Sequence, residues 1–165
     1  MRYEMKVDGM AEISELLGKL EDKAPSVASG ALYEGAAVMA EEVKKGAEGI
    51  RTAPFQFAKP GERRLPSPEE KKIIVDAGIG IAKFDKNGTE VDTSVGYRNA
   101  GYAELAGKQV PAPLIVNSVN SGTSFLIKQP FVRKAARTGG TKAMKKMTEH
   151  IDNAFAEYIK EMNKL

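Results

Sequence analysis

The chain contains no cysteine and no tryptophan, and a single histidine, among its 165 residues. Without cysteine, a disulfide framework and a thiolate nucleophile are both excluded. One histidine and no cysteine also exclude a His/Cys zinc site. No apolar run approaches the ~20 residues of a membrane span, and residues 1–6 have no apolar core of signal-peptide length. We therefore expect a soluble, cytoplasmically made protein with no membrane partner and no cofactor.

Motifs for catalysis are equally scarce. Residues 78–80 have two glycines but lack the third glycine and the strand-to-helix order of a dinucleotide fingerprint. Residues 139–142 contain phosphate-loop residue types in the wrong order and spacing. His150 stands alone in a helical pattern, where a histidine is far more often a packing or surface residue than a base. The sequence therefore predicts a protein that is not an enzyme.

The composition is that of an ordinary globular protein, with 42% hydrophobic and 28% charged residues. A chain of this length suits one domain, residues 1–165, able to bury roughly two-thirds of its unfolded surface.

Charge is segregated along the chain although the net charge is only +3. Residues 1–50 carry ten acidic and six basic side chains. Residues 105–148 carry no acidic side chain, and their basic ones are Lys108, Lys128, Arg133, Lys134, Arg137, Lys142, Lys145 and Lys146. This pattern fits either a solvated helix face or a surface for DNA phosphates or an acidic partner. Since only two aromatic residues lie nearby, any DNA contact should be to the backbone and independent of base sequence.

The N-terminal third predicts two helices. Apolar residues at helical spacing cover residues 10–23, with Asp8 as a plausible N-cap. Pro25 suits the first position of a second helix that continues to about Gly49. Residues 50–66 contain three prolines and no periodicity, which predicts an extended Pro-rich loop.

The middle of the chain predicts a short helix and a β-hairpin. Ser67, Pro68 and Glu70 form a capping-box signature for a helix that ends near Ala77. Residues 79–84 and 90–97 read as antiparallel strands joined through the turn residues 85–88.

The C-terminal half is predicted from turn residues and apolar patterns. Residues 99–107 should be a Gly- and Ala-rich crossing, and residues 114–116 fit either a short helix or a strand. Residues 125–128 should form a third strand. Pro130 should begin a helix that is broken at residues 139–140, and the terminal helix has an apolar stripe made of Ala143, Met147, Ile151, Ala154, Phe155, Tyr158 and Met162.

These elements predict an α+β fold. A long N-terminal helix pair and a C-terminal helix should pack on a small antiparallel β-sheet that includes a β-hairpin.

Residues 120–135 are the most informative segment, because they place a Gly-Thr step and a short apolar stretch before Gln-Pro-Phe and a basic helix. No enzyme chemistry requires that order of residues. The segment resembles the C-terminal signature of the HK97 gp10-like family of phage neck and tail-completion proteins. The order of the preceding elements is similar to that family as well, including a hairpin that closes on a Val-Gly step at Val95 and Gly96.

The resemblance implies a structural virion protein of a tailed phage or prophage, a neck or tail-completion subunit at the head–tail junction. It would lie in the host cytoplasm before assembly. Its partners would be further copies in a ring, six by the family's pattern. They would also include the head-closure protein, the tail terminator or tail tube, and the double-stranded DNA in the channel. Two alternatives stay open: a tail terminator of the same connector region, and a free DNA-binding protein without sequence specificity.

Two sets of residues are the candidate contacts. The DNA channel or a subunit contact is expected at Lys128, Arg133, Lys134 and Arg137. The Pro-rich loop is expected to contact a partner through Phe55, Phe57, Arg63 and Arg64.

Overall fold

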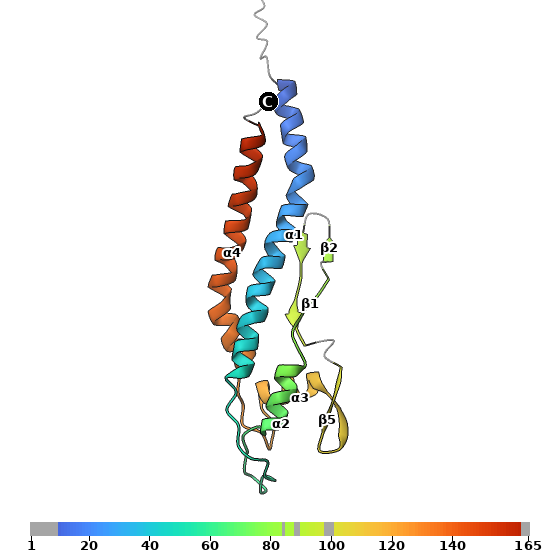
Figure 1. Ribbon diagram of the computed structural model, residues 1–165, viewed down its shortest axis with the longest axis vertical. Helices are drawn as coiled ribbons and strands as arrows, with labels where there is room; N and C mark the ends of the chain where they lie inside the picture. Colours follow the sequence, from blue (N-terminus) through green and yellow to red (C-terminus); the bar gives the residue numbers. More distant parts are fainter. Residues whose placement is uncertain (1–9, 84, 88–89, 98–100, 163–165) are drawn as a thin grey trace, which may run out of the picture.

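The computed structural model describes residues 10–83, 85–87, 90–97 and 101–162. The proposed N-cap Asp8 and the turn residue Gly88 lie outside these ranges. Within them the protein is an α+β structure in which two long helices rise from a small base of short helices and hairpins (Figure 1). None of the described helices has the length and apolar character needed to span a membrane.

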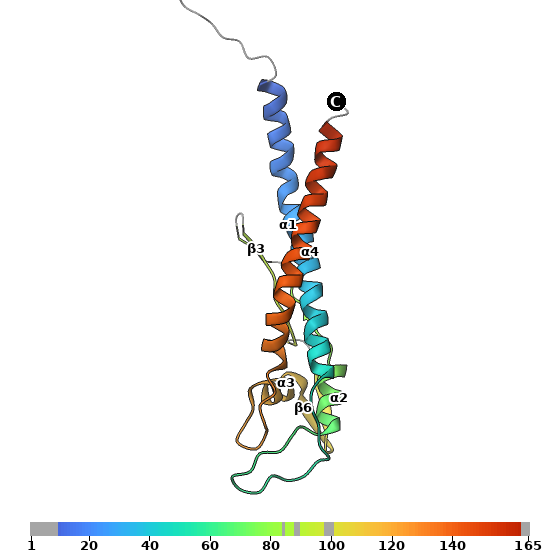
Figure 2. The same cartoon turned by 90° about the vertical axis from the view of Figure 1, so that its left-hand side faces the viewer.

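The two long helices are α1 (Met10–Glu48) and α4 (Phe131–Met162). They run antiparallel and side by side, with their free ends at the top of the molecule and their joined ends in the base (Figures 1 and 2). Ion pairs across the interface follow the antiparallel order, since Lys142 contacts Glu42 at 2.8 Å and Lys23 contacts Glu161 at 2.9 Å. The helices therefore form one long antiparallel pair. We call this pair the helical hairpin, although residues 49–130, which contain the rest of the fold, lie between its two helices in the sequence.

The predicted break between two N-terminal helices is wrong, because α1 continues through Pro25 as one helix of 39 residues. Proline removes one helical N–H donor and costs about 3 kcal/mol in a helix interior. The Ser29 hydroxyl donates to the Pro25 carbonyl at 2.8 Å, a local bond that does not replace the missing N–H donor. The helical hydrogen bonds on both sides and the packing against α4 outweigh the local cost.

Glycines let the two helices approach each other closely. A Cβ added at Gly35 would lie 2.6 Å from the Met147 sulfur, and one at Gly30 would lie 2.6 Å from the Nε2 of His150. Each glycine is a notch on α1 that receives a large side chain of α4. The long helices are therefore matched in register, residue against residue.

The predicted break at Gly139 and Gly140 is also wrong, because α4 is continuous. Gly139 is buried against α1, where an added Cβ would lie 2.9 Å from the Met39 sulfur and 3.2 Å from the Glu42 Cβ. Gly140 has open space around it. The first glycine therefore serves helix packing and not helix termination.

The base contains α2 (Pro68–Asp76) and α3 (Ala112–Ser121). The predicted capping box is confirmed, since the Ser67 hydroxyl accepts from the Glu70 N–H and the Glu70 carboxylate accepts from the Ser67 N–H. The segment with two possible structures, residues 114–116, is helical. The main core joins the lower ends of the long helices to the base through Val43, Ala47, Ile50, Ile74, Tyr97, Ile115, Val116, Val119, Leu126, Phe131 and Ala135.

The described strands form three separate two-stranded antiparallel sheets. In the predicted hairpin, β1 (Gly80–Ile81) pairs with β4 (Val95–Gly96), and β2 (Asp85–Asn87) pairs with β3 (Glu90–Asp92). The hairpin is therefore confirmed, but its strand pairing is interrupted. The turn predicted at residues 85–88 is wrong in position, because Asp85–Asn87 pair with Glu90–Asp92 as a strand. It runs alongside α1, so it covers one side of the helical hairpin (Figure 1).

Two further strand predictions differ from the structure. The crossing expected at residues 99–107 contains β5 (Tyr102–Leu105), which pairs with β6 (Lys108–Pro111). Both turn residues, Ala106 and Gly107, have positive φ angles of 52° and 75°, as a tight hairpin turn requires. Alanine is not a turn signal there, so the sequence pattern did not reveal the hairpin. The third strand expected at 125–128 is reduced to a single bridge between Leu126 and Arg64, because no longer partner segment lies beside it.

The adjacent glycines of α4 provide a matched test of the packing argument. Gly140→Ala should raise the free energy of unfolding by about 0.5–1 kcal/mol, because alanine is the better helix former and meets nothing. Gly139→Ala has the same helical gain but must displace Met39 and Glu42, so we expect it to be about 1–2 kcal/mol less stable than Gly140→Ala. Urea unfolding followed by circular dichroism measures both. Equal stabilities of the two variants would contradict the tight packing of Gly139 against α1.

Candidate functional site

The Gly-Thr step forms a tight turn after α3. Gly122 has φ 78°, and an added Cβ would lie 3.0 Å from the Lys128 Cβ, so both its backbone conformation and the close approach favour glycine. The Thr123 hydroxyl accepts from the N–H groups of Phe125 at 3.3 Å and Leu126 at 3.0 Å. The turn thereby folds the chain back toward the start of α4.

The residues after the turn join this segment to α1 and α3. The Gln129 side-chain amide pairs with the backbone of Arg51, donating to its carbonyl at 2.7 Å and accepting from its N–H at 3.0 Å. Asn120 Oδ1 accepts from the Val132 N–H at 3.1 Å, which satisfies one of the unpaired donors at the start of α4. Phe131 is buried in the core. These contacts hold the basic start of α4 in a fixed position.

The four basic residues predicted for a channel or subunit contact are all exposed at this joint. Lys128 precedes α4, and Arg133, Lys134 and Arg137 share the solvent face of its first two turns. Within the described part of the chain, none of the four has an acidic partner. Their charges are therefore available to a ligand or a neighbouring subunit.

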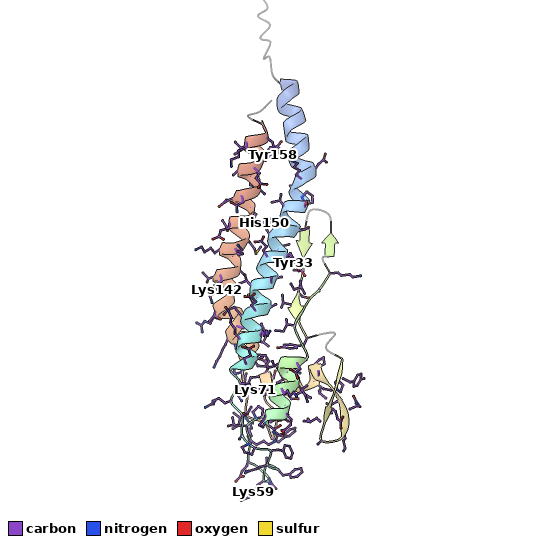
Figure 3. All side chains as sticks on the ribbon, in the orientation of Figure 1. Tyr33, Lys59, Lys71, Lys142, His150 and Tyr158 are labelled. Atoms are coloured by element: carbon purple, nitrogen blue, oxygen red, sulfur yellow. The ribbon has the colours of Figure 1, made fainter. Side chains whose placement is uncertain are left out.

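The lysines further along α4 differ, because they are paired. Lys142 contacts Glu42 at 2.8 Å and lowers the pKa of that carboxyl group, and Lys146 lies 3.9 Å from Glu34. Figure 3 shows Lys142 on the long helix above the base. The basic residues of α4 and its entry are therefore divided into an unpaired group at the start of the helix and a paired group further along. In the paired group, Lys142 and Lys146 contact α1, whereas Lys145 pairs with Glu149 of α4 itself.

The structure adds two basic residues that the sequence pattern did not identify. Lys128 and Lys134 line an open surface hollow of about 510 Å³ together with Lys45, from the last turn of α1, and Arg51, which follows α1. Glu42 lines the same hollow and pairs with Lys45 at 3.5 Å. Arg51 is about 80 positions away in the sequence from Lys128 and is brought there by Gln129. No local signal indicates this approach, since it depends on how the ends of α1 and α4 meet.

Helix stability does not explain the basic residues at the start of α4. The first turn of a helix carries partial positive charge, so cations are unfavourable there and anions are favoured. The first turn of α4 has no acidic residue and contains Arg133 and Lys134, and Arg137 lies in the second turn. The arrangement is suited to phosphate oxygens or carboxylates supplied from outside the chain.

The Pro-rich loop, residues 51–66, extends below the base (Figure 2). Phe57 is 89% exposed and packs edge-on against Phe55, with ring centroids 5.2 Å apart. Arg63 is exposed as well. Figure 3 shows Lys59 at the far end of the loop. These positions leave Phe57 and Arg63 accessible to a partner.

Arg64 is placed differently from its neighbours in the loop. Its guanidinium forms two 2.7 Å hydrogen bonds to the Glu70 carboxylate and lies 4.8 Å from the centre of the Phe55 ring. The Arg64 and Glu70 side chains are only 14% and 6% exposed. Arg64 therefore joins the loop to the capping box of α2, and it supports the loop from inside the fold.

A cluster of metal-ligating side chains is not found among the described residues. No group of three histidine, aspartate or glutamate side chains among them could hold a metal ion. His150 contacts Glu34 at 2.9 Å across the α1–α4 interface. Burial raises the pKa of Tyr97 to about 12, which keeps this core phenol neutral. Comparisons with protein-family models, with curated proteins and with solved structures found no match to this chain.

The neighbouring residues Arg63 and Arg64 separate a surface role from a structural one. Arg64→Met should lower the free energy of unfolding by about 3 kcal/mol, because it leaves the buried Glu70 without its ion-pair partner. Arg63→Met should change it by less than about 0.5 kcal/mol, since that side chain is exposed. Chemical unfolding of both variants gives the comparison. Similar stability of the two would show that the Arg64–Glu70 pair does not support the loop.

Proposed function

We propose that this protein is a structural subunit of a tailed phage or prophage, a neck or tail-completion protein that assembles into a ring around the DNA channel at the head–tail junction. The observation that carries the proposal is the surface of the chain. Its two long helices extend well beyond the base and pack against each other along one side only, so much of their surface lies in solvent (Figures 1 and 2). A chain with so much surface is suited to burial between subunits.

Exposed apolar side chains support the same interpretation. Contiguous apolar patches on a protein surface mark interaction sites, and Phe55, Leu114 and Phe125 line one shared hollow. Around the base the exposed apolar side chains come from the loop, the β5–β6 hairpin, α3 and the segment before α4, namely Phe55, Phe57, Tyr102, Leu114 and Phe125. We assign this part of the molecule to contacts with neighbouring subunits and with the head-closure, terminator or tube protein.

The unpaired basic residues suit the channel. Lys128, Arg133, Lys134 and Arg137 can attract the phosphates of passing duplex DNA without reading its sequence. A dense basic lining would hold the DNA and impede its passage, whereas four moderately spaced side chains per subunit provide weaker attraction. The segment with an acidic excess, residues 1–50, is then left to face neighbouring subunits. A ring of six copies is the expected form.

The same unpaired cations favour a second candidate, a free DNA-binding protein without sequence specificity. A tail terminator of the same connector region remains an alternative with the same geometry.

The mass of the purified protein, measured by light scattering over a concentration series with negative-stain images, distinguishes the ring-forming candidates from the free DNA-binding protein. Rings with an opening wide enough for duplex DNA support the neck or terminator function. A monomer that binds duplex DNA with steep salt dependence supports the second candidate.

Reversal of two unpaired charges tests the channel assignment. The double variant Arg133→Glu/Arg137→Glu should leave the fold intact and abolish particle maturation or ring assembly, because it places carboxylates against phosphates or against the acidic neighbour. The control Lys44→Glu/Lys72→Glu changes the net charge equally at exposed positions elsewhere. Complementation of a defective phage and the mass of the assembly are the measurements. If the R133E/R137E variant matures particles as the wild type does, the assignment is wrong.

The loop assignment has its own test. Phe57→Glu should leave the free energy of unfolding within about 0.5 kcal/mol of wild type, since the ring is 89% exposed. It should nevertheless reduce ring assembly or attachment of the neighbouring protein. Limited proteolysis supplies a second readout, because cleavage between residues 55 and 63 should slow when the subunit assembles. Equal cleavage rates in free and assembled protein would contradict a partner contact at this loop.

A further inference from the structure

A basic hollow lies where the end of α1 meets the start of α4, and we call it the joint hollow. Its volume is about 510 Å³. On α4 its lining residues include Phe131, Lys134 and Thr138, which share one face of the helix, whereas Arg133 and Arg137 are not among them. The joint hollow therefore separates Lys134 from the two arginines of the same turns.

Two close contacts fix the shape of the joint hollow. Gly46 of α1 lies against the start of α4, since an added Cβ would be only 3.2 Å from the Phe131 carbonyl oxygen. The Gln129 side chain holds the backbone of Arg51 with hydrogen bonds of 2.7 and 3.0 Å. Because these bonds use only the backbone of Arg51, its guanidinium is left for other contacts. The basic side chains thus lie around the hollow before any ligand binds, which lowers the cost of binding.

The joint hollow has a surplus of positive charge. Three of its cations have no acidic partner among the described residues, namely Arg51, Lys128 and Lys134. The acidic lining residue, Glu42, is already paired with Lys142 at 2.8 Å and with Lys45 at 3.5 Å. A concave surface lined by one sign of charge focuses its field and attracts ligands of the opposite sign.

The stability of the fold does not account for this gathering of charge. Lys45 lies in the last turn of α1, where the helix dipole favours a cation. Lys128 and Lys134 lie at the start of α4, where the dipole disfavours one. Like charges around one hollow also repel each other. A ligand of opposite charge removes both costs.

The surroundings of the hollow indicate which kind of anion it binds. Positive charge continues from the hollow to Arg133 and Arg137 on the adjoining face of α4, and neither has an acidic partner among the described residues. A ligand that uses this whole surface must carry a row of negative charges, as a duplex backbone does. Phe131 is buried and no exposed aromatic side chain lines the hollow, so bases have nothing to stack on. This combination favours the phosphate backbone of a duplex over a single strand.

We propose, on the basis of the function proposed above, that the joint hollow holds one stretch of the phosphate backbone of duplex DNA. Arg51, Lys128 and Lys134 contact the phosphates, and Gln129 positions Arg51 through its backbone. The two arginines of the adjoining face continue the contact outside the hollow. The DNA surface thereby includes the end of α1, which lies outside the basic run of the sequence.

Neutral substitutions test the three contacts. Arg51→Gln, Lys128→Gln and Lys134→Gln should each weaken binding of a short labelled duplex roughly threefold to tenfold, and should each reduce the slope of log K against log salt by about one. Lys44→Gln and Lys72→Gln remove the same charge at exposed positions outside the hollow and should leave the slope unchanged. Fluorescence anisotropy over a series of salt concentrations measures both quantities. Urea unfolding should show no change for Arg51→Gln, because the hydrogen bonds that hold residue 51 use its backbone.

Gln129→Met tests the positioning role with every charge retained. It should weaken duplex binding in the otherwise unchanged protein, because Arg51 is no longer held at the hollow. In the Arg51→Gln background it should have little further effect, since the residue that it positions is already neutral. Equal losses in the two backgrounds would mean that Gln129 only supports the fold, and would refute its positioning role.

The measured assembly state keeps this result separate from the proposed function. In a protein that forms rings, duplex binding that is unaffected by Arg51→Gln would overturn the joint hollow and leave the ring function standing. In a protein that stays monomeric, binding that depends on Arg51 would support the hollow together with the second, DNA-binding candidate. Wild-type protein that binds no duplex at low salt would also overturn the proposal. So would displacement of the duplex by pyrophosphate, but not by sulfate, at matched ionic strength, because the hollow would then bind a small phosphate ligand.

Discussion

The close approach of α1 and α4 is the constraint on which the rest of the structure depends. Glycines of one helix receive the large side chains of the other, as Gly35 receives Met147, and Gly139 lies against Met39. Packing of this kind allows only one register, because shifting either helix would place side chains against each other where no space exists. The ion pairs between Glu42 and Lys142 and between Lys23 and Glu161 then follow from that register.

The base converts this helical hairpin into a protein with defined surfaces. Phe131 and Ala135 of α4 share a core with Ile74 of α2 and Val119 of α3, so the start of α4 cannot move independently of the base. Gln129 adds a paired contact to the end of α1. As a result, unpaired cations occupy one rigid position, and the aromatic loop is held below them by the Arg64–Glu70 pair.

The two ends of the molecule have different chemistry. Exposed aromatic residues and unpaired cations gather around the base, whereas an apolar groove lies between the free ends of the long helices. The length of the two helices separates these surfaces.

The sequence by itself determined the elements whose signals are local. Neighbouring residues were enough to predict the capping box at Ser67 and Glu70, the hairpin around residues 85–92, the Pro-rich loop and the α+β class. The four unpaired cations could be identified as part of a basic run. Only the tertiary structure decided that α1 continues through Pro25 and α4 through Gly139, because packing between distant helices outweighs local propensity there. It also decided that Lys45 and Arg51 join the basic surface and that Arg64 is held inside the fold, since these contacts connect residues whose approach no local pattern encodes.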